Sequence, residues 1–161
     1  NTKGQKDAPV WLVEFSDFKC PACKAFSGTV ADLIKKYPDR LLIAYRYFPL
    51  DLHPQSVPAA IAAESAGKQG KFWEMEQLLF ANQDRFSDTL YTELAAQLGL
   101  DMNAFTASIQ DPATKQAVTN DTTYGNSIGI SATPTFFLNG VKLSLLAPAD
   151  LTKEVEKVIL K

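Results

Sequence analysis

The sequence has few of the residues that bind soft metals or build disulfide frameworks. Its 161 residues include two cysteines, one histidine and two methionines. A network of several disulfides is excluded, because two cysteines form at most one bond within a chain. A closed zinc site needs four ligands, usually cysteine and histidine, so such a site within this chain would have to recruit carboxylates.

The sequence also lacks an excess of charge of either sign and lacks long apolar runs. Its formal net charge is −2, which does not favour binding to nucleic acid or to an anionic membrane. No apolar run approaches the ~20 residues of a membrane-spanning helix. The hydrophobic share of 46% and the length predict one globular domain with a substantial core.

The first part of the chain predicts a strand, a helix and a second strand. Residues 10–15, VWLVEF, form an apolar run broken only by Glu14, which is typical of a strand covered on both faces. Residues 21–37 carry apolar side chains with helical spacing, and RLLIAYRYF (40–48) predicts the next strand. A helix of this length favours a parallel pair. The polar stretch before residue 10 predicts a disordered lead-in.

The rest of the chain predicts a helical region followed by a hairpin and a last helix. Residues 54–130 show helical periodicity and no strand pattern, which predicts an all-helical insertion. Asn139-Gly140 between two apolar runs then predicts a hairpin with a type I′ turn, and a final helix follows from Pro148. The expected α/β organisation is a polar lead-in (1–9), strand–helix–strand (10–53), helical insertion (54–130), and hairpin with C-terminal helix (131–161).

Both cysteines lie in one motif, FSDFKCPACKAF (15–26). Pro21 suits the first position of a helix, which places Cys20 at the N-cap and Cys23 one turn inside. A thiolate at Cys20 would face unpaired backbone N–H groups and the positive end of the helix dipole, so its pKa should be lowered. The pattern favours a redox pair in which Cys20 is the nucleophile and Cys23 the resolving thiol.

Two other uses of the cysteine pair stay open. As a structural disulfide, the pair would close a loop of four residues and remove only about 2 kcal/mol of unfolded-state entropy. As a metal clip, it would need further ligands that the neighbouring sequence does not offer.

The CPAC motif, placed after an apolar strand and at the start of a helix, resembles the active site of the thioredoxin superfamily. The helical block between the second strand and the closing hairpin is similar to the DsbA-like branch, the extracytoplasmic thiol-disulfide oxidoreductases. FPL (48–50) and ATPTFFLNG (132–140) extend the resemblance over nearly the whole chain. It implies a thioredoxin-like fold with an all-helical insertion.

The resemblance also implies roles for residues outside the motif. Thr133-Pro134 looks like the cis-proline loop that lies beside the cysteines and pairs with the backbone of a bound polypeptide. Glu14, six residues before Cys20, stands where DsbA-like proteins carry a buried acid. Burial in an apolar strand should raise its pKa, so that it exchanges a proton with Cys23 through water. The alternative for Glu14 is a strand residue turned to solvent.

An uncharged rim is expected around Cys20, and such a rim suits an unfolded polypeptide better than one small molecule. Its expected members are Phe18, Pro21, Ala22, Thr133 and Pro134. His53, in the segment FPLDLHPQS, is interpreted as a surface or packing histidine rather than a catalytic base.

The resulting hypothesis is a dithiol oxidase that introduces disulfides into extracytoplasmic proteins, in the periplasm or tethered to a membrane outside the cytoplasm. It needs no cofactor, because the sulfurs of Cys20 and Cys23 carry both electrons. The expected partners are unfolded or cysteine-containing polypeptides and a membrane quinone-linked redox protein; we expect a monomer and no nucleic acid.

The alternatives are a disulfide reductase of the same fold and a dithiol module that binds copper(I) or zinc. The Pro-Ala dipeptide between the cysteines differs from the Pro-His of the most oxidising relatives. This difference implies a milder oxidant and leaves the direction of electron flow open.

Overall fold

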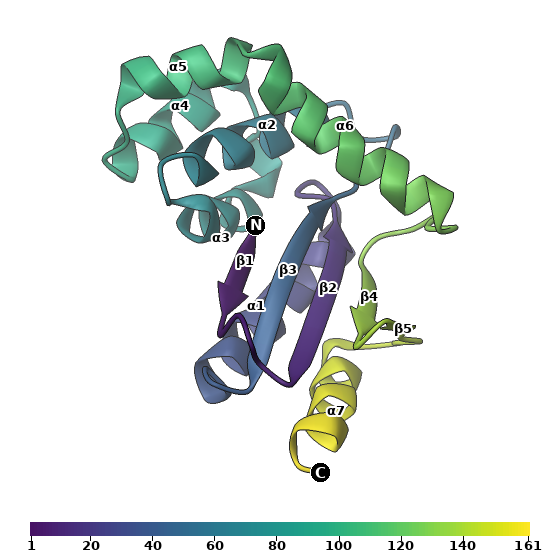
Figure 1. The fold of residues 1–161 in the computed structure, drawn as a ribbon. Helices are drawn as coiled ribbons and strands as arrows, with labels where there is room; N and C mark the ends of the chain where they lie inside the picture. Colours follow the sequence, from purple (N-terminus) through teal and green to yellow (C-terminus); the bar gives the residue numbers. More distant parts are fainter.

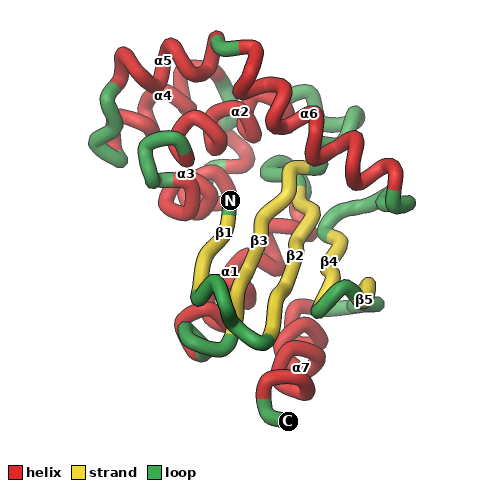
Figure 2. Tube along the Cα trace, in the orientation of Figure 1, coloured by secondary structure: helices red, strands yellow, loops and turns green.

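The computed structural model describes residues 1–161 as one five-stranded sheet with helices against it (Figures 1 and 2). The strands are β1 (Thr2–Gly4), β2 (Val10–Ser16), β3 (Leu41–Tyr47), β4 (Thr135–Leu138) and β5 (Val141–Lys142). The helices are α1 (Pro21–Lys36), α2 (Ser56–Gly67), α3 (Phe72–Ala81), α4 (Asp88–Gln97), α5 (Met102–Gln110), α6 (Pro112–Ser127) and α7 (Pro148–Ile159), with a 3-10 turn at Gln83–Arg85. No helix combines the length and apolar composition needed to cross a membrane.

The strand order is β1-β3-β2-β4-β5. β2 and β3 are parallel and are joined by α1, as the sequence pattern predicts, and β4 runs antiparallel to β2. This register sets Glu14 opposite Tyr45 on β3 and opposite Phe136 on β4. Glu14 therefore lies in the centre of the sheet.

The N-terminal residues differ from the sequence-based expectation. Instead of being disordered, residues 2–4 form strand β1, which pairs antiparallel with β3 at the edge of the sheet. The pairing uses backbone hydrogen bonds, and the side chains of β1 are exposed. Polar composition therefore did not prevent this segment from becoming a strand, because an edge strand needs no apolar side chains of its own.

The side chains of β2 point alternately to the two faces of the sheet. Val10 and Leu12 belong to a buried cluster with residues of α1 and α7, and Glu14 points to the same face because side chains two apart share a side. Trp11 and Val13 point the other way. There they border a mostly apolar hollow of about 400 Å³, which Tyr124 of α6 also lines. Helices α1 and α7 thus cover this face of the sheet at Val10 and Leu12, and Glu14 is buried on the same face.

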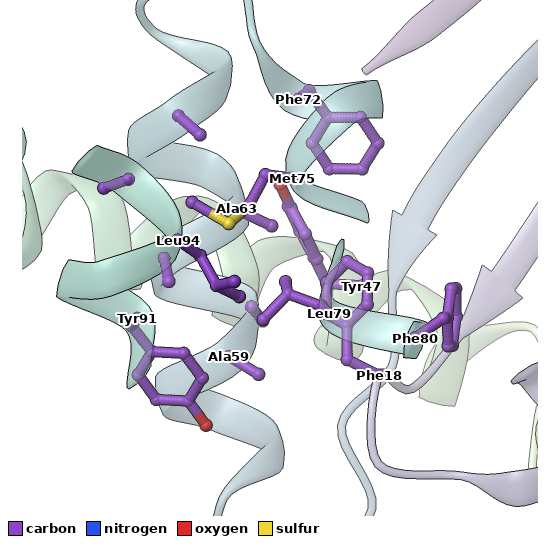
Figure 3. Close-up of a cluster of buried hydrophobic side chains, with 14 of the residues drawn as sticks. Phe18, Tyr47, Ala59, Ala63, Phe72, Met75, Leu79, Phe80, Tyr91 and Leu94 are labelled. Atoms are coloured by element: carbon purple, nitrogen blue, oxygen red, sulfur yellow. The ribbon is translucent and has the colours of Figure 1, made fainter. Parts of the chain in front are cut away.

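The helical insertion, α2 to α6, packs at the end of the sheet where β2 and β3 finish (Figure 1). Figure 3 shows how its core continues into the sheet: Met75 and Leu79 of α3 lie between residues of α2 and α4 and the aromatic side chains of Phe18 and Tyr47. One continuous core therefore joins the insertion to the segment that carries the cysteines.

The predicted hairpin is confirmed. Asn139 and Gly140 have φ values of 47° and 82°, the positive angles that a type I′ turn needs at both central positions. The Asn139 side chain accepts a hydrogen bond from the backbone N–H of Trp11 at 2.8 Å, which fixes the turn to the start of β2. The second arm is short, because β5 contains only Val141 and Lys142.

Candidate active site

Cys20 lies at the N-cap of α1 with Pro21 at the first helical positions, as the sequence predicts. The residue is 7% exposed, and its thiol donates a hydrogen bond to the carbonyl oxygen of Thr133 at 3.5 Å. The pKa of Cys20 is lowered to about 5, mainly by the hydrogen bond from the Cys23 thiol, with smaller contributions from Thr133 and from the backbone N–H groups of Ala22 and Cys23. The neighbouring thiol is thus a stronger support than the start of the helix, on which the sequence argument relied.

Cys23 has the opposite environment. It is fully buried, and burial raises the pKa of its thiol far above the usual value; the hydrogen bond to Cys20 and the charge of Glu14 raise it further. The backbone N–H of Asp17 points at its sulfur at 3.5 Å. The two thiols, both free in this structure, are therefore strongly unequal: one is poised to ionise and the other to hold its proton.

The segment around Thr133-Pro134 comes from the far end of the chain and lies beside Cys20. The Thr133–Pro134 peptide bond is cis. Together with Ala22 from α1, these two residues border a groove of about 400 Å³. The groove is completed by Phe26, Thr135, Phe136, Leu143, Ser144, Leu145 and Leu146.

The groove contains apolar residues that the sequence argument did not single out. Leu146 is 98% exposed, and Leu143 and Leu145 are partly buried behind it. They follow the short strand β5, where the sequence suggested only the continuing arm of a hairpin. An exposed leucine in the groove that Ala22 and Thr133 also line offers a contact for an apolar side chain of a bound polypeptide.

Glu14 is buried at 2% exposure, so the alternative of a solvent-facing strand residue is wrong. Burial raises its pKa to about 7, and the neighbouring Ser16 hydroxyl offsets part of the rise. One carboxyl oxygen of Glu14 makes no hydrogen bond within the protein, and neither do the hydroxyls of Ser16 and Tyr45. Since its charge acts on Cys23, Glu14 is close enough to influence the protonation of that thiol.

The expected rim divides into two groups. Pro21 and Ala22 are exposed, and Thr133 and Pro134 are partly exposed, so all four border the surface around Cys20. Phe18 does not: it is 1% exposed and stacks on Tyr45 with ring centroids 5.1 Å apart. Phe18 is therefore a core residue, and its expected place on the rim is wrong because Tyr45 of β3 and Phe80 of α3 pack against it.

His53 pairs with a buried carboxylate immediately before the motif. Its Nδ1 lies 2.7 Å from an oxygen of Asp17, whose side chain is completely buried. The same carboxylate accepts hydrogen bonds from the backbone N–H groups of Lys19 and Leu50. Asp17 thereby ties the loop before Cys20 to the loop after β3, and His53 is its side-chain partner in that loop.

Gln83 was missed by the sequence argument. Its buried side-chain amide donates to the carbonyl oxygens of Phe18 and Cys20 at 2.7 and 2.9 Å. The Lys19 ammonium donates to the carbonyl of Gln83 itself. The helical insertion thus holds the backbone of the motif in place, and no sequence signal marks this contact because it joins residues more than sixty positions apart.

Glu76, on α3, is a second buried acid that the sequence argument did not consider. It is 5% exposed, and burial and the charge of Glu14 raise its pKa to about 8. No group of three or more His, Cys, Asp or Glu side chains is arranged to hold a metal ion.

Comparison with known proteins places this site in a family. Residues 2–157 match the thioredoxin family. Wolbachia pipientis alpha-DsbA1 superposes with a TM-score of 0.85 and 25% identity, over 98% of this chain and 89% of that one. Bacillus subtilis BdbD in its oxidised form superposes with a TM-score of 0.82 and 24% identity, over 99% and 92% of the two chains.

The class is therefore that of the proteins with a thioredoxin fold of the DsbA type. The chain belongs to the thioredoxin family, with the fold of its DsbA-like members.

A relative in sequence carries a different name. The Na(+)/H(+) antiporter NhaA 1 of Mycolicibacterium vanbaalenii is 37% identical over 145 residues, which cover 88% of this chain. This chain spans about a quarter of that relative's length. The match therefore concerns one portion of the antiporter.

Proposed function

We propose that this chain oxidises pairs of thiols in extracytoplasmic polypeptides, with the Cys20–Cys23 disulfide as the oxidant. The observation that carries the proposal is the opposite shift of the two thiols: the pKa of Cys20 is lowered to about 5, whereas that of Cys23 is raised. A thiol of low pKa leaves a disulfide readily, and its stabilised thiolate makes the disulfide a stronger oxidant.

The first step is attack by a substrate thiolate on the sulfur of Cys20. The Cys20–Cys23 bond breaks, a mixed disulfide forms with Cys20, and Cys23 departs with the electron pair. Because the environment of Cys23 disfavours a thiolate, the sulfur takes up a proton. Glu14, whose pKa of about 7 leaves it protonated about half of the time at neutral pH, is the group placed to supply that proton.

The second step releases the product. A second substrate thiolate attacks the substrate sulfur of the mixed disulfide, and Cys20 leaves as a thiolate. The Cys23 thiol and the Ala22 and Cys23 backbone N–H groups stabilise that thiolate. The substrate leaves with a disulfide and the enzyme is left as a dithiol, so the two sulfurs have taken up both electrons and no other cofactor takes part.

The groove beside Cys20 supports a polypeptide as the substrate. Ala22, Thr133 and Pro134 offer an uncharged wall, and Leu146 adds an exposed apolar side chain. An extended peptide lying along the groove would bring its cysteine to Cys20 and its neighbouring side chains against these residues.

Turnover needs reoxidation of the dithiol. We infer that a membrane quinone-linked redox protein accepts the electrons and that the chain works outside the cytoplasm, in the periplasm or tethered to a membrane. The DsbA-type structures that share this fold support that placement by analogy. The reverse activity, disulfide reduction, uses the same site, and the redox potential decides between them.

The experiment is to mix the oxidised protein with a reduced peptide that contains two cysteines and to follow the peptide disulfide by mass spectrometry. Wild type should yield the peptide disulfide, and Cys20→Ala and Cys23→Ala should yield none, because neither variant can form the Cys20–Cys23 disulfide that takes up the two electrons. Thermal unfolding of each variant verifies that it folds. Exchange activity that survives in Cys20→Ala would refute the assignment.

A further inference from the structure

The backbone N–H of Asp17 points at the sulfur of Cys23. Strand β2 ends at Ser16, so the N–H of the next residue lies beyond the strand pairing of the sheet. Its acceptor is the Cys23 sulfur, which is 3.5 Å away and fully buried. A buried N–H needs an acceptor, and an uncharged sulfur is a weak one. The contact therefore gains most in strength when the sulfur of Cys23 becomes negative.

That negative charge arises in the first step of the exchange. When a substrate thiolate attacks Cys20, the bond between the two sulfurs breaks and its electron pair goes to Cys23. The sulfur is then an anion within the hydrophobic core, which is costly unless hydrogen-bond donors face it. Both thiols are free in this structure, so the contact with Asp17 is present in the state in which Cys23 has left the disulfide. The N–H thus stabilises the departing sulfur more than the intact disulfide.

The other polar atoms of Asp17 fix the direction of this N–H. Its buried carboxylate accepts hydrogen bonds from the backbone N–H groups of Lys19 at 2.8 Å and Leu50 at 3.1 Å. The Nδ1 atom of His53 lies 2.7 Å from the same carboxylate. The carbonyl oxygen of Asp17 accepts from the backbone N–H of Cys20 at 3.1 Å. Residue 17 is therefore held both to the motif and to the loop after β3, so the donor is in place before the reaction begins.

We propose that the backbone N–H of Asp17 is a catalytic donor to the departing Cys23 sulfur, and that the Asp17 carboxylate and His53 are the positioning groups that hold this N–H in place. The donor acts before the sulfur takes up its proton, and no bond to Asp17 forms or breaks. During reoxidation the same N–H faces Cys23 when it becomes a thiolate and attacks. The proposal rests on the exchange activity proposed above and adds a group to its mechanism.

The N–H can be removed by itself, because Cys20 is a site for native chemical ligation. A synthetic segment 1–19 joined to a segment 20–161 that begins with Cys20 gives the full chain. An ester at residue 17, made with the α-hydroxy analogue of aspartate, deletes the N–H and keeps the carboxylate. The matched control is an ester at residue 11, which deletes the N–H that Trp11 donates to Asn139 on the hairpin. The measurements are the stopped-flow rate at which a dithiol peptide reduces each oxidised protein, and the pKa of Cys20 from thiolate absorbance.

The ester at residue 17 should slow the reduction about tenfold, which is less than the ~100–1000-fold lost with an oxyanion-hole donor, because sulfur is the weaker hydrogen-bond acceptor. The ester at residue 11 should react at the rate of the ligated protein that contains only amide bonds. The pKa of Cys20 should stay at its wild-type value in both ester proteins, since the deleted N–H contacts the other sulfur.

The carboxylate is tested with Asp17→Asn and Asp17→Ala. The control is Asp101→Asn, because the carboxylate of Asp101 also accepts from two backbone N–H groups, those of Asn103 and Ala104 at the start of α5. Asp17→Asn keeps one acceptor oxygen and should be slowed less than Asp17→Ala. Asp101→Asn should keep the wild-type rate. Thermal unfolding of each variant and ester protein verifies that it folds.

The outcomes separate a catalytic donor from a structural role. A slow ester protein with an unchanged pKa of Cys20 supports the donor. An ester protein with the wild-type rate overturns the donor and leaves the exchange activity standing. A slow ester protein in which the pKa of Cys20 has also risen overturns it too, because the change then acts through the shape of the motif. If the ester protein does not fold, the same two readouts in Asp17→Asn decide. Absence of exchange in wild type would instead refute the proposed function itself.

Discussion

The ionisation of Cys20 can be tested through its strongest support, the thiol of Cys23. The pKa of Cys20 is lowered from 9.0 to about 5, first of all by the hydrogen bond from Cys23. A hydrogen bond to a charged group contributes about 1.5–3 kcal/mol, which corresponds to ~1–2 pKa units. Cys23→Ala should therefore raise the pKa of Cys20 by ~1–2 units, whereas Cys23→Ser, which retains a donor, should raise it less.

The size of the Cys20 pKa shift also affects the redox potential of the Cys20–Cys23 pair. The lowered pKa of Cys20 stabilises the reduced folded protein above pH 5. This contribution to its stability is lost as the pH falls through 5. At pH 7 the gain is at most ~2.7 kcal/mol, two pH units at 1.36 kcal/mol each. Solvent screening of this partly exposed thiol reduces the gain to ~1–2 kcal/mol, or ~20–45 mV toward a more oxidising potential.

The assay is the ultraviolet absorbance of the thiolate as a function of pH, supported by the rate of alkylation with iodoacetamide. In both Cys23 variants the single remaining thiol makes the assignment unambiguous. A wild-type Cys20 that titrates near ~8.5, the value of an ordinary thiol, would refute the reasoning. Equal Cys20 pKa values in Cys23→Ala and Cys23→Ser would show that the hydrogen bond from residue 23 does not cause the lowering of the Cys20 pKa.

Three further predictions concern stability and its dependence on pH, each measured by urea unfolding of the reduced protein. Because the pKa of Glu14 is raised from 4.5 to about 7, the protonated carboxyl contributes fully to stability below pH 4.5, and this contribution is lost as the pH rises through 7. The free energy of unfolding should therefore fall by up to ~3 kcal/mol over this range. Glu14→Gln should flatten that fall. A pH profile that Glu14→Gln leaves unchanged would contradict the buried carboxyl. His53→Ala removes the side-chain partner of the buried Asp17 and should destabilise by ~1–3 kcal/mol, with a smaller loss in His53→Asn; no loss would mean that the pair is dispensable. Gly125→Ala places a Cβ 2.7 Å from a phenylalanine ring and should destabilise by ~1–3 kcal/mol, whereas Gly28→Ala, with open space around it, should stabilise by ~0.5–1 kcal/mol.

Much of the fold follows from local patterns in the sequence. The apolar run of β2 and the helical spacing after Pro21 predict a strand and a helix with Cys20 at their junction, and that is how they form. Asn139-Gly140 predicts its turn because few residue pairs adopt two consecutive positive φ angles. These features could be predicted because each depends on neighbouring residues.

The features that were missed depend on residues distant in the chain. Strand β1 forms because the edge of β3 offers backbone partners, which no pattern within residues 1–9 reveals. Phe18 is buried because Tyr45 stacks on it and the tilted ring of Phe80 packs against it, so its apolar character alone did not distinguish core from rim. Glu76 could have been found: it lies four residues after Phe72 and three before Leu79, on the buried face of a helix whose period was recognised.

The most direct test of the oxidase assignment is the two-electron potential of the Cys20–Cys23 pair, obtained by equilibration with glutathione and quantification of the free thiols. The strongly unequal thiols predict a potential above about −200 mV, on the oxidising side of the thioredoxin value of about −270 mV. A potential at or below about −270 mV would contradict the account, because a pair that reducing would donate electrons to disulfides instead of accepting them.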